Sequence, residues 1–346
     1  MQTAASPAPS RVLGYQLNGV AAVSGADAWA AGTTSYITLH MVRWDGRSWQ
    51  RVPTPGVGYF NGVAAVSTTD AWAVGTGPGY GSKALIEHWN GTAWTVAAIP
   101  STGGPAVLHA VATISPGDVW AVGGTNFTSK TVVLHWDGTA WTRVSSPTPP
   151  GVSPALDAVA GTSATNAWAV GSTFTKTGRV PLVEHWDGTA WRQVPGPVLP
   201  GGGTLSGVAA TSVDNAWAVG TDGSGAVIEH WNGTAWTLVR SPAVGRADGL
   251  ASVTALSATS AWAVGVSLHL HQQGEVTLIA HWNGKSWTQV PSPALGVLTG
   301  VTATSASSAW AVGYFTGSST GVIEHWDGSS WTCIASTGTA GPCPAR

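Results

Sequence analysis

The histidines of this sequence are the residues whose spacing most directly suggests chemistry. Imidazole can transfer protons near neutral pH and is a common metal ligand, and ten histidines occur among 346 residues. Six of them stand immediately before a tryptophan in a motif that recurs along the chain: His88, His135, His185, His230, His281 and His325, with Arg43 at the same place in the first copy. A residue that recurs in every copy cannot build one metal site. We therefore expect these side chains to satisfy buried backbone or carboxylate groups between copies, with four glutamates beside them: Glu87, Glu184, Glu229 and Glu324.

Two further histidines fall outside this pattern. His269 and His271 lie in the segment SLHLHQQGE, where a spacing of two places both side chains on one face of an extended chain. A protein zinc site takes three or four ligands, and only Glu275 is close to them in sequence. No Ser-His-Asp arrangement, phosphate-binding loop or glycine-rich nucleotide fingerprint stands out. We expect no metal and no cofactor, and we assign no catalytic residue.

The copies themselves are the dominant signal. The pentapeptide AWAVG at 71–75 returns with little change, and the first tryptophans of successive copies are 43 to 49 residues apart. These seven tryptophans are Trp29, Trp72, Trp120, Trp168, Trp217, Trp262 and Trp310. A second motif, HWNGTAW at 88–94, brings two more tryptophans per copy, so seven copies account for all 21. A fixed period of this length predicts a repeat architecture. We therefore expect the tryptophans to be structural residues of the repeat before they are candidates for a binding site.

Each copy divides into four short strands. In residues 60–100 these are GVAAVS, AWAVG, ALIEHW and TAWTV, separated by polar, Gly-rich or Pro-rich segments. We expect Asp70 to close the first turn on its own backbone. We expect Asn90 and Gly91 to form a type I′ hairpin turn, which needs positive φ at both central residues. No stretch shows a helical period, so the protein should be all-β.

Neighbouring copies must cover both faces of each sheet, because a single four-stranded sheet of this size cannot bury them alone. A seven-bladed β-propeller with four antiparallel strands per blade does so. A content of 43% hydrophobic and 9% charged residues fits sheets that are buried on both faces. We assign residues 16–335 to the propeller, with tails at 1–15 and 336–346. We expect the seventh blade to contain only its own strands and to close on the first by side-chain packing.

The unit GVAAVS…DAWAVG…LIEHWNGTAW resembles tandem repeats of secreted or surface bacterial propellers and, more distantly, propellers of the Asp-box and photosystem-assembly-factor types. The resemblance covers about residues 16–335. It implies the fold but little about function, because such propellers include lectins, scaffolds and enzymes. In an Asp-box the glycine stands two residues after the aspartate, whereas Asp187 and Gly188 are adjacent. The calcium-binding or sialidase roles of some Asp-box proteins are therefore not expected.

Positions at which the copies differ are the candidates for a binding site. One first-strand position holds Asn18, Asn61, His109, Asp157, Ser206, Ala251 and Thr299. If this strand is innermost, these side chains ring one mouth of the central channel. The loops at that face carry Tyr36, Tyr80, Phe127, Phe174, His269, His271, Tyr314 and Phe315. Aromatic rings beside polar groups suit sugar stacking or peptide docking, although they also suit simple capping of the blades. We expect one pocket near the axis, walled by Asn61, His109 and Asp157, to dominate.

Composition limits the partners. The chain has 14 basic and 16 acidic residues, a net charge of −2 and no basic run, which argues against a nucleic-acid partner. No apolar stretch is long enough to span a membrane. The start MQTAASPAPS resembles a mature N-terminus left after removal of a signal peptide, with an added Met. Cys333 and Cys343 suit a local disulfide of an oxidising compartment, with two free thiols as the alternative. We expect a monomer that is secreted or held at the cell surface.

Three functions remain open. The first is an extracellular binding propeller, lectin-like or protein-docking, for a carbohydrate or other hydroxyl-rich small molecule or for an extracellular protein. The second is an enzyme, such as a polysaccharide lyase or hydrolase or a small-molecule cyclase, with His109 and Asp157 as acid and base at the channel mouth. The third is a structural propeller without an evolved ligand. Binding is favoured over catalysis, because the ring holds one carboxylate whereas glycoside hydrolysis uses two at a controlled separation.

Overall fold

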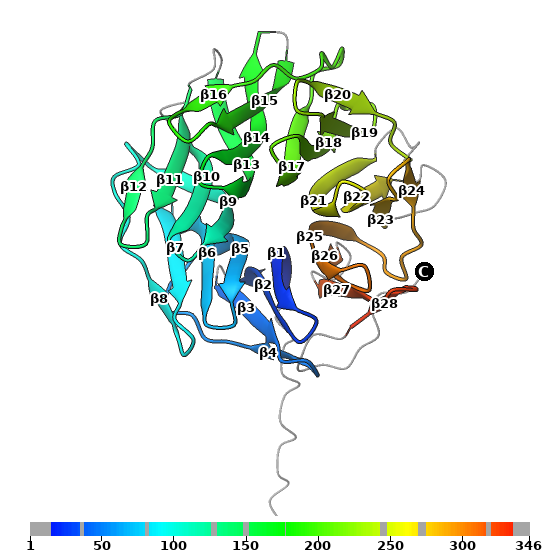
Figure 1. Ribbon diagram of the computed structural model, residues 1–346. Helices are drawn as coiled ribbons and strands as arrows, with labels where there is room; N and C mark the ends of the chain where they lie inside the picture. Colours follow the sequence, from blue (N-terminus) through cyan, green and yellow to red (C-terminus); the bar gives the residue numbers. More distant parts are fainter. Residues whose placement is uncertain are drawn as a thin grey trace, which may run out of the picture.

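The protein forms a ring of seven four-stranded sheets around a central axis (Figure 1). The computed structural model describes residues 15–34, 38–79, 83–125, 130–147, 152–176, 178–242, 248–268, 275–315 and 320–334. Each sheet consists of four consecutive strands in simple order, with neighbouring strands antiparallel. The first strand of each sheet faces the axis and the fourth lies at the outer edge (Figure 1). The predicted seven-bladed, all-β propeller is confirmed.

The blades follow chain order. Blades one to four comprise β1 (Tyr15–Ser24), β2 (Asp27–Thr34), β3 (Leu39–Trp44) and β4 (Trp49–Arg51); β5 (Tyr59–Ser67), β6 (Asp70–Thr76), β7 (Ala84–Trp89) and β8 (Trp94–Val96); β9 (Ala106–Ser115), β10 (Asp118–Thr125), β11 (Thr131–Trp136) and β12 (Trp141–Arg143); and β13 (Val152–Ser163), β14 (Asn166–Thr175), β15 (Gly178–Trp186) and β16 (Trp191–Gln193). Blades five to seven comprise β17 (Thr204–Ser212), β18 (Asn215–Thr221), β19 (Ala226–Trp231) and β20 (Trp236–Val239); β21 (Gly249–Ser257), β22 (Ser260–Leu268), β23 (Glu275–Trp282) and β24 (Trp287–Gln289); and β25 (Val297–Ser305), β26 (Ser308–Phe315), β27 (Thr320–Trp326) and β28 (Trp331–Cys333).

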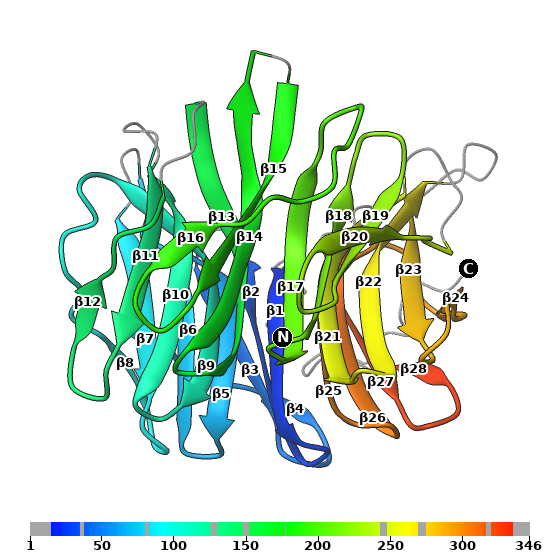
Figure 2. The ribbon, with the colours of Figure 1, turned by 45° about the horizontal axis from the view of Figure 1, so that its top comes forward.

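Antiparallel order gives the ring two different ends (Figure 2). One end, termed the hairpin end, holds the turns between first and second strands and between third and fourth strands. The other end, termed the linker end, holds the loops between second and third strands and the linkers that join one blade to the next. Every turn, loop and linker residue can therefore be assigned to an end from its position in the repeat.

The turn between third and fourth strands differs from the predicted type. In the second blade Trp89 pairs with Trp94, so four residues form the connection. Gly91 has a φ of 94°, but Asn90 does not have positive φ, so the prediction of a type I′ turn is wrong. Instead, Asn90 Oδ1 accepts hydrogen bonds from the N–H groups of Thr92 and Ala93, each at 3.0 Å. The side chain closes the turn, which removes the need for a second left-handed residue.

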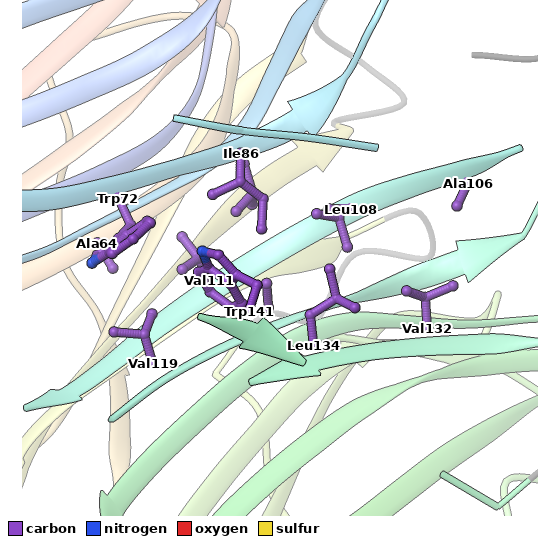
Figure 3. Close-up of a cluster of buried hydrophobic side chains, with 12 residues drawn as sticks. Ala64, Trp72, Ile86, Ala106, Leu108, Val111, Val119, Val132, Leu134 and Trp141 are labelled. Carbon is purple, nitrogen blue, oxygen red and sulfur yellow. The ribbon is translucent and has the colours of Figure 1, made fainter. Parts of the chain in front are cut away.

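Tryptophans from adjacent blades build the core between the sheets. Trp72 of the second blade lies between Trp136 and Trp141 of the third, at ring-centroid distances of 5.0 and 5.2 Å, the second contact being edge-to-face. The same triad forms at all seven blade boundaries, so all 21 tryptophans take part. Figure 3 shows Ile86 and Leu108 in the same cluster between the second and third blades. Each blade thus depends on its neighbour for burial.

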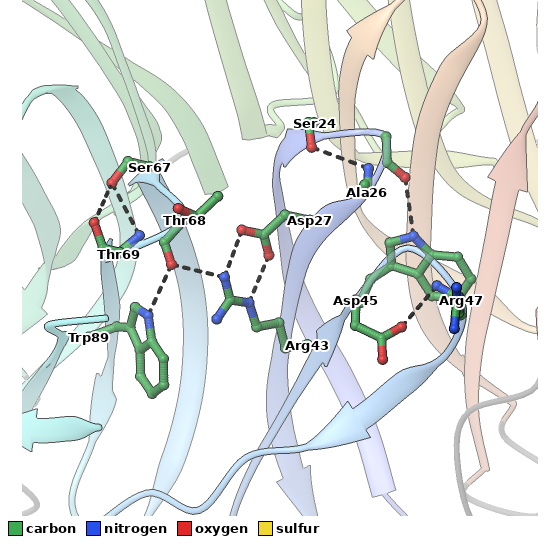
Figure 4. A network of polar contacts seen from close by, with 12 residues as sticks. Ser24, Ala26, Asp27, Arg43, Asp45, Arg47, Ser67, Thr68, Thr69 and Trp89 are labelled. Atoms are coloured by element: carbon green, nitrogen blue, oxygen red, sulfur yellow. Dashed lines mark hydrogen bonds and ion pairs between the residues drawn. The ribbon is translucent and has the colours of Figure 1, made fainter. Parts of the chain in front are cut away.

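Near the hairpin end of every blade, a side chain of the third strand hydrogen-bonds a side chain at the start of the second strand; this contact is termed the polar brace. In the second blade His88 Nε2 donates to Asp70 Oδ1 at 2.9 Å, and the imidazole stacks on Trp72 at 4.1 Å. In the first blade Arg43 replaces histidine and forms two hydrogen bonds of 2.8 Å with Asp27 (Figure 4). The bracing partners in the seven blades are Asp27, Asp70, Asp118, Asn166, Asn215, Ser260 and Ser308. Two expectations are corrected. The histidines bond within their own blade and not to the glutamates, and Asp70 holds its histidine instead of closing the turn.

The ring closes by side-chain packing, as predicted. Trp310 of the seventh blade lies between Trp44 and Trp49 of the first, at 5.0 and 5.1 Å. Within the described residues, the seventh sheet contains only β25 to β28. Cys333 at the end of β28 is disulfide-bonded, and Cys343, the other cysteine of the chain, lies outside the described residues.

Candidate functional site

The inner strands enclose an axial cavity of about 220 Å³. Its lining includes every position of the predicted ring: Asn18, Asn61, His109, Asp157, Ser206, Ala251 and Thr299. At this position each first strand carries a β-bulge. In the second blade, for example, Phe60 pairs with Gly75 and Gly62 with Val74, which leaves Asn61 outside the ladder. A bulge redirects a side chain from regular alternation, which accounts for polar groups at the axis.

Several ring side chains tie neighbouring blades together. Asn18 Nδ2 donates to the carbonyl of Phe60 at 2.7 Å, and Asn61 Nδ2 donates to the carbonyl of Leu108 at 2.8 Å. Thr299 Oγ1 donates to the carbonyl of Leu17 at 2.7 Å across the closure. These groups have a structural use at the axis, so part of the polarity predicted for a ligand serves the fold.

His109 and Asp157 form the one acid–base pair of the ring. Their Nδ1 and Oδ1 atoms are 2.9 Å apart, and Nδ1 is also 3.2 Å from the carbonyl of Leu156. Because both neighbours are acceptors, the proton of a neutral His109 belongs on Nδ1, which leaves Nε2 as an acceptor. Each side chain is 30% exposed, so the pair is accessible from the cavity.

The predicted loop aromatics only partly fall within the described residues. Tyr36, Tyr80, Phe127, His269 and His271 lie outside them. Phe174 is exposed at 41%, and the Arg179 guanidinium lies over its ring at 4.4 Å. Burial, and then the charge of Glu275, raise the pKa of the Tyr314 hydroxyl. Neither Phe174 nor Tyr314 lines the axial cavity.

Larger pockets, which sequence reasoning missed, occur at the outer edge of the linker end. They are termed the rim pockets, and each lies between the start of a third strand and the outgoing linker. Their volumes are about 370, 500 and 380 Å³ in the first, second and third blades. Their lining includes Thr38, Arg51 and Thr54 in the first blade, Lys83, Ser101 and Thr102 in the second, and Lys130, Arg143 and Ser145 in the third. The axial cavity is therefore not the dominant one.

In two other blades the linker itself occupies the corresponding place. In the fourth blade Leu199 is buried in the core, and Gly203 N–H donates to the carbonyl of Arg179 at the start of β15, at 2.7 Å. In the sixth blade Ala294 is fully buried, and the Gly296 N–H donates to the carbonyl of Glu275 at the start of β23, at 3.1 Å. These linkers close onto the third strand, whereas the linkers of blades one and two leave an opening. The third-blade linker lies within the described residues only as far as residue 147.

Three of the four buried glutamates accept a hydrogen bond from a linker between blades. Glu87 accepts the Gly56 N–H at 2.8 Å, and Glu184 accepts the Ser146 hydroxyl at 2.7 Å. Glu324 likewise accepts the hydroxyl of Ser292, whereas neither oxygen of Glu229 has a hydrogen-bond partner among the described residues. Burial raises the pKa of all four carboxyls to about 7: Glu87, Glu184, Glu229 and Glu324.

The described part of the chain contains no group of three or more His, Cys, Asp or Glu side chains that could hold a metal ion. Nor do the described residues form a helix long and apolar enough to cross a membrane.

The fold and these cavities define a seven-bladed β-propeller with accessible surfaces at the axis and at the rim. No family model and no curated protein matches the chain. A structure of YCF48 bound to D1 peptide shares 16% identity at a TM-score of 0.56, over 83% of this chain and 84% of that chain. Aleuria aurantia lectin in complex with Fucα1-6GlcNAc shares 14% identity at a TM-score of 0.53, over 94% and 97%. The GH74 xyloglucanase from Xanthomonas campestris shares 14% identity at a TM-score of 0.51, over 94% of this chain and 61% of that chain. Similarity at this level establishes the fold alone.

Proposed function

We propose that this protein is a non-catalytic, extracellular binding propeller that holds a carbohydrate or another hydroxyl-rich ligand at its linker end. The observation that carries the proposal is the set of rim pockets in blades one to three. In blades one and two, whose linkers are described throughout, the pocket stays open, whereas linkers fill the corresponding places in blades four and six. Hydroxyl, backbone and cationic groups in their lining can pair with sugar hydroxyls. Propellers similar to this one are seen with a peptide and with a fucosylated disaccharide, which supports a binding role.

The axial cavity offers little support for catalysis. The side chains of Asn18, Asn61 and Thr299 each donate a hydrogen bond to a backbone carbonyl of a neighbouring blade. Among the described residues that line the axial cavity, Asp157 is the only carboxylate, and it is engaged by His109. A second carboxylate, which glycoside hydrolysis normally uses, is absent from the described lining.

A glycan array followed by titration of variants tests this proposal. Ser101→Trp combined with Ser145→Trp places bulky side chains in two rim pockets, and we expect it to abolish or strongly weaken carbohydrate binding. Ser224→Trp, at an exposed position in the linker-end loop of the fifth blade, is the matched control and should bind as the parent does. Binding that survives the blocked pockets but disappears in His109→Ala and Asp157→Ala would place the site at the axis instead.

One observation favours a second candidate. The His109–Asp157 pair has the composition of an acid–base dyad and opens into a cavity. A xyloglucanase among the structures of this fold is consistent with an enzyme that acts on a polysaccharide. Reducing-end release from plant and bacterial polysaccharides by the parent, and its loss in Asp157→Asn, would favour this enzyme over the binding propeller.

A further inference from the structure

Acidic residues are unevenly distributed between the two ends of the ring. All sixteen lie in the described parts of the chain, and most stand in the hairpin-end turns or are buried in the blades. Only Asp222, Asp248 and Glu275 occupy the linker end, and they belong to the fifth blade, the linker after it and the sixth blade. The linker end of blades one to four therefore presents no carboxylate outside the axial cavity.

Basic residues show the opposite distribution. Arg51, Lys83, Lys130 and Arg143 are exposed and line the three rim pockets. None of the four forms an ion pair within the described residues, in contrast to Arg43 and Arg192 at the hairpin end, which pair with aspartates. Unpaired cations at the mouth of a pocket favour an anionic ligand.

Arg143, which lines the third-blade pocket, also lies against the linker of the second blade. A Cβ placed on Gly103, in the linker that walls the second-blade pocket, would lie 2.7 Å from Arg143 Nη1. The guanidinium thus occupies the space that a side chain at Gly103 would take, while Arg143 itself belongs to the third blade and lines the third-blade pocket. A planar guanidinium in this place can bind a carboxylate in the third-blade pocket. The adjacent glutamates, Glu87 and Glu184, are buried, and their raised pKa limits the negative charge beneath the pockets.

We propose that the rim pockets of blades one to three bind an acidic polysaccharide, with uronate carboxylates on the cations and sugar hydroxyls on the Ser and Thr side chains. The inference rests on the proposed function and adds the charge of the ligand. A polysaccharide fits better than an acidic peptide, because three pockets of similar composition on consecutive blades match a polymer with one repeating unit. Engagement of a second pocket raises affinity through effective concentration.

Calorimetric titration with oligogalacturonides of defined length tests the proposal. The matched neutral ligands are the same oligomers after reduction of their carboxylates to alcohols. We expect the acid form to bind, with affinity rising once the chain spans two pockets, and the reduced form to bind at least about tenfold more weakly. Lys83→Gln combined with Arg143→Gln should cost about tenfold or more. Arg47→Gln combined with Lys285→Gln removes the same charge from exposed hairpin-end positions and should leave binding unchanged.

Four results would overturn the inference. Equal binding of acid and reduced oligomers, with loss on blocking the pockets, would retain a rim carbohydrate site but refute its preference for acid. Equal losses in both double variants would show that only overall charge matters. Tighter binding of polyglutamate than of oligogalacturonide of the same charge would favour an acidic peptide. If neither acidic nor neutral glycans bind, the proposed carbohydrate function fails together with the inference.

Discussion

Replacing Glu229 should make the protein more stable, and increasingly so as the pH rises. Both oxygens of this carboxyl lack a partner in the described residues, and its side chain is fully buried. Burial raises its pKa from 4.5 to about 7. A folded-state pKa above the unfolded value means that the stabilising contribution is complete below pH 4.5 and is lost as the pH rises through 7. The wild-type protein therefore becomes less stable across this interval.

The magnitude follows from the shift. Each pKa unit corresponds to about 1.36 kcal/mol, so ionising Glu229 in the folded state costs about 3 kcal/mol at pH 8. Glu229→Leu, which copies Leu134 of the third blade, removes this cost. We expect the free energy of unfolding of the variant to exceed that of the parent by about 3 kcal/mol more at pH 8 than at pH 4. For 346 residues this corresponds to a rise of about 4 °C in Tm.

Urea unfolding at half-unit steps from pH 4 to pH 8.5 measures the effect. Glu324→Leu is the matched variant: it should show the same change with pH, but offset by a loss of about 1 kcal/mol, because it removes the hydrogen bond that the Ser292 hydroxyl donates to Glu324. Gly196→Ser offers Glu229 a hydroxyl, since a Cβ there would lie 3.4 Å from Oε2, and should flatten the pH dependence. Parallel stability curves for Glu229→Leu and the parent would refute the reasoning, because they would show that the carboxyl titrates normally in the folded state.

Three further predictions concern the parts that hold the ring together. Trp72→Ala should lower the free energy of unfolding by about 3 to 5 kcal/mol, because it empties the triad between two blades; an effect below 1 kcal/mol in urea unfolding would contradict the role given to the triad. Asn61→Ala should cost about 1 kcal/mol in the same assay through loss of its bond to the carbonyl of Leu108, and no change would mean that the bond contributes nothing. Cys333→Ser should cost about 2 to 3 kcal/mol, and thiol titration of the unreduced, denatured parent should detect no free sulfhydryl; two reactive thiols would rule out the bridge.

Much of the fold was predictable because each blade repeats one local pattern. The spacing of Trp29 and its six equivalents predicted the number of blades, and alternating apolar strands predicted their internal order. The ring position that contains Asn61 and His109 was also identified correctly as lining the axis. Strand order places the same position of every copy at the same radius, so differences between copies at that position converge in space.

The turn geometry and the contacts at the axis could not be predicted from the pattern of residue types. The prediction of a type I′ turn at Asn90 was wrong, because the Asn90 side chain and a single left-handed glycine, Gly91, close a longer connection equally well. The use of Asn18 and Thr299 as ties between blades became visible only when the carbonyls of the next inner strand were in place.

The rim pockets show the same limit. Lys83 and Lys130 are visible in the sequence just before a third strand, but whether a pocket opens beside them depends on how the outgoing linker folds. Leu199 and Ala294 fill the space in two blades, and the linkers of the first two blades leave it open. Strands follow from local periodicity because every copy buries the same faces, whereas a linker takes its path from contacts with two blades at once, which only the tertiary structure supplies.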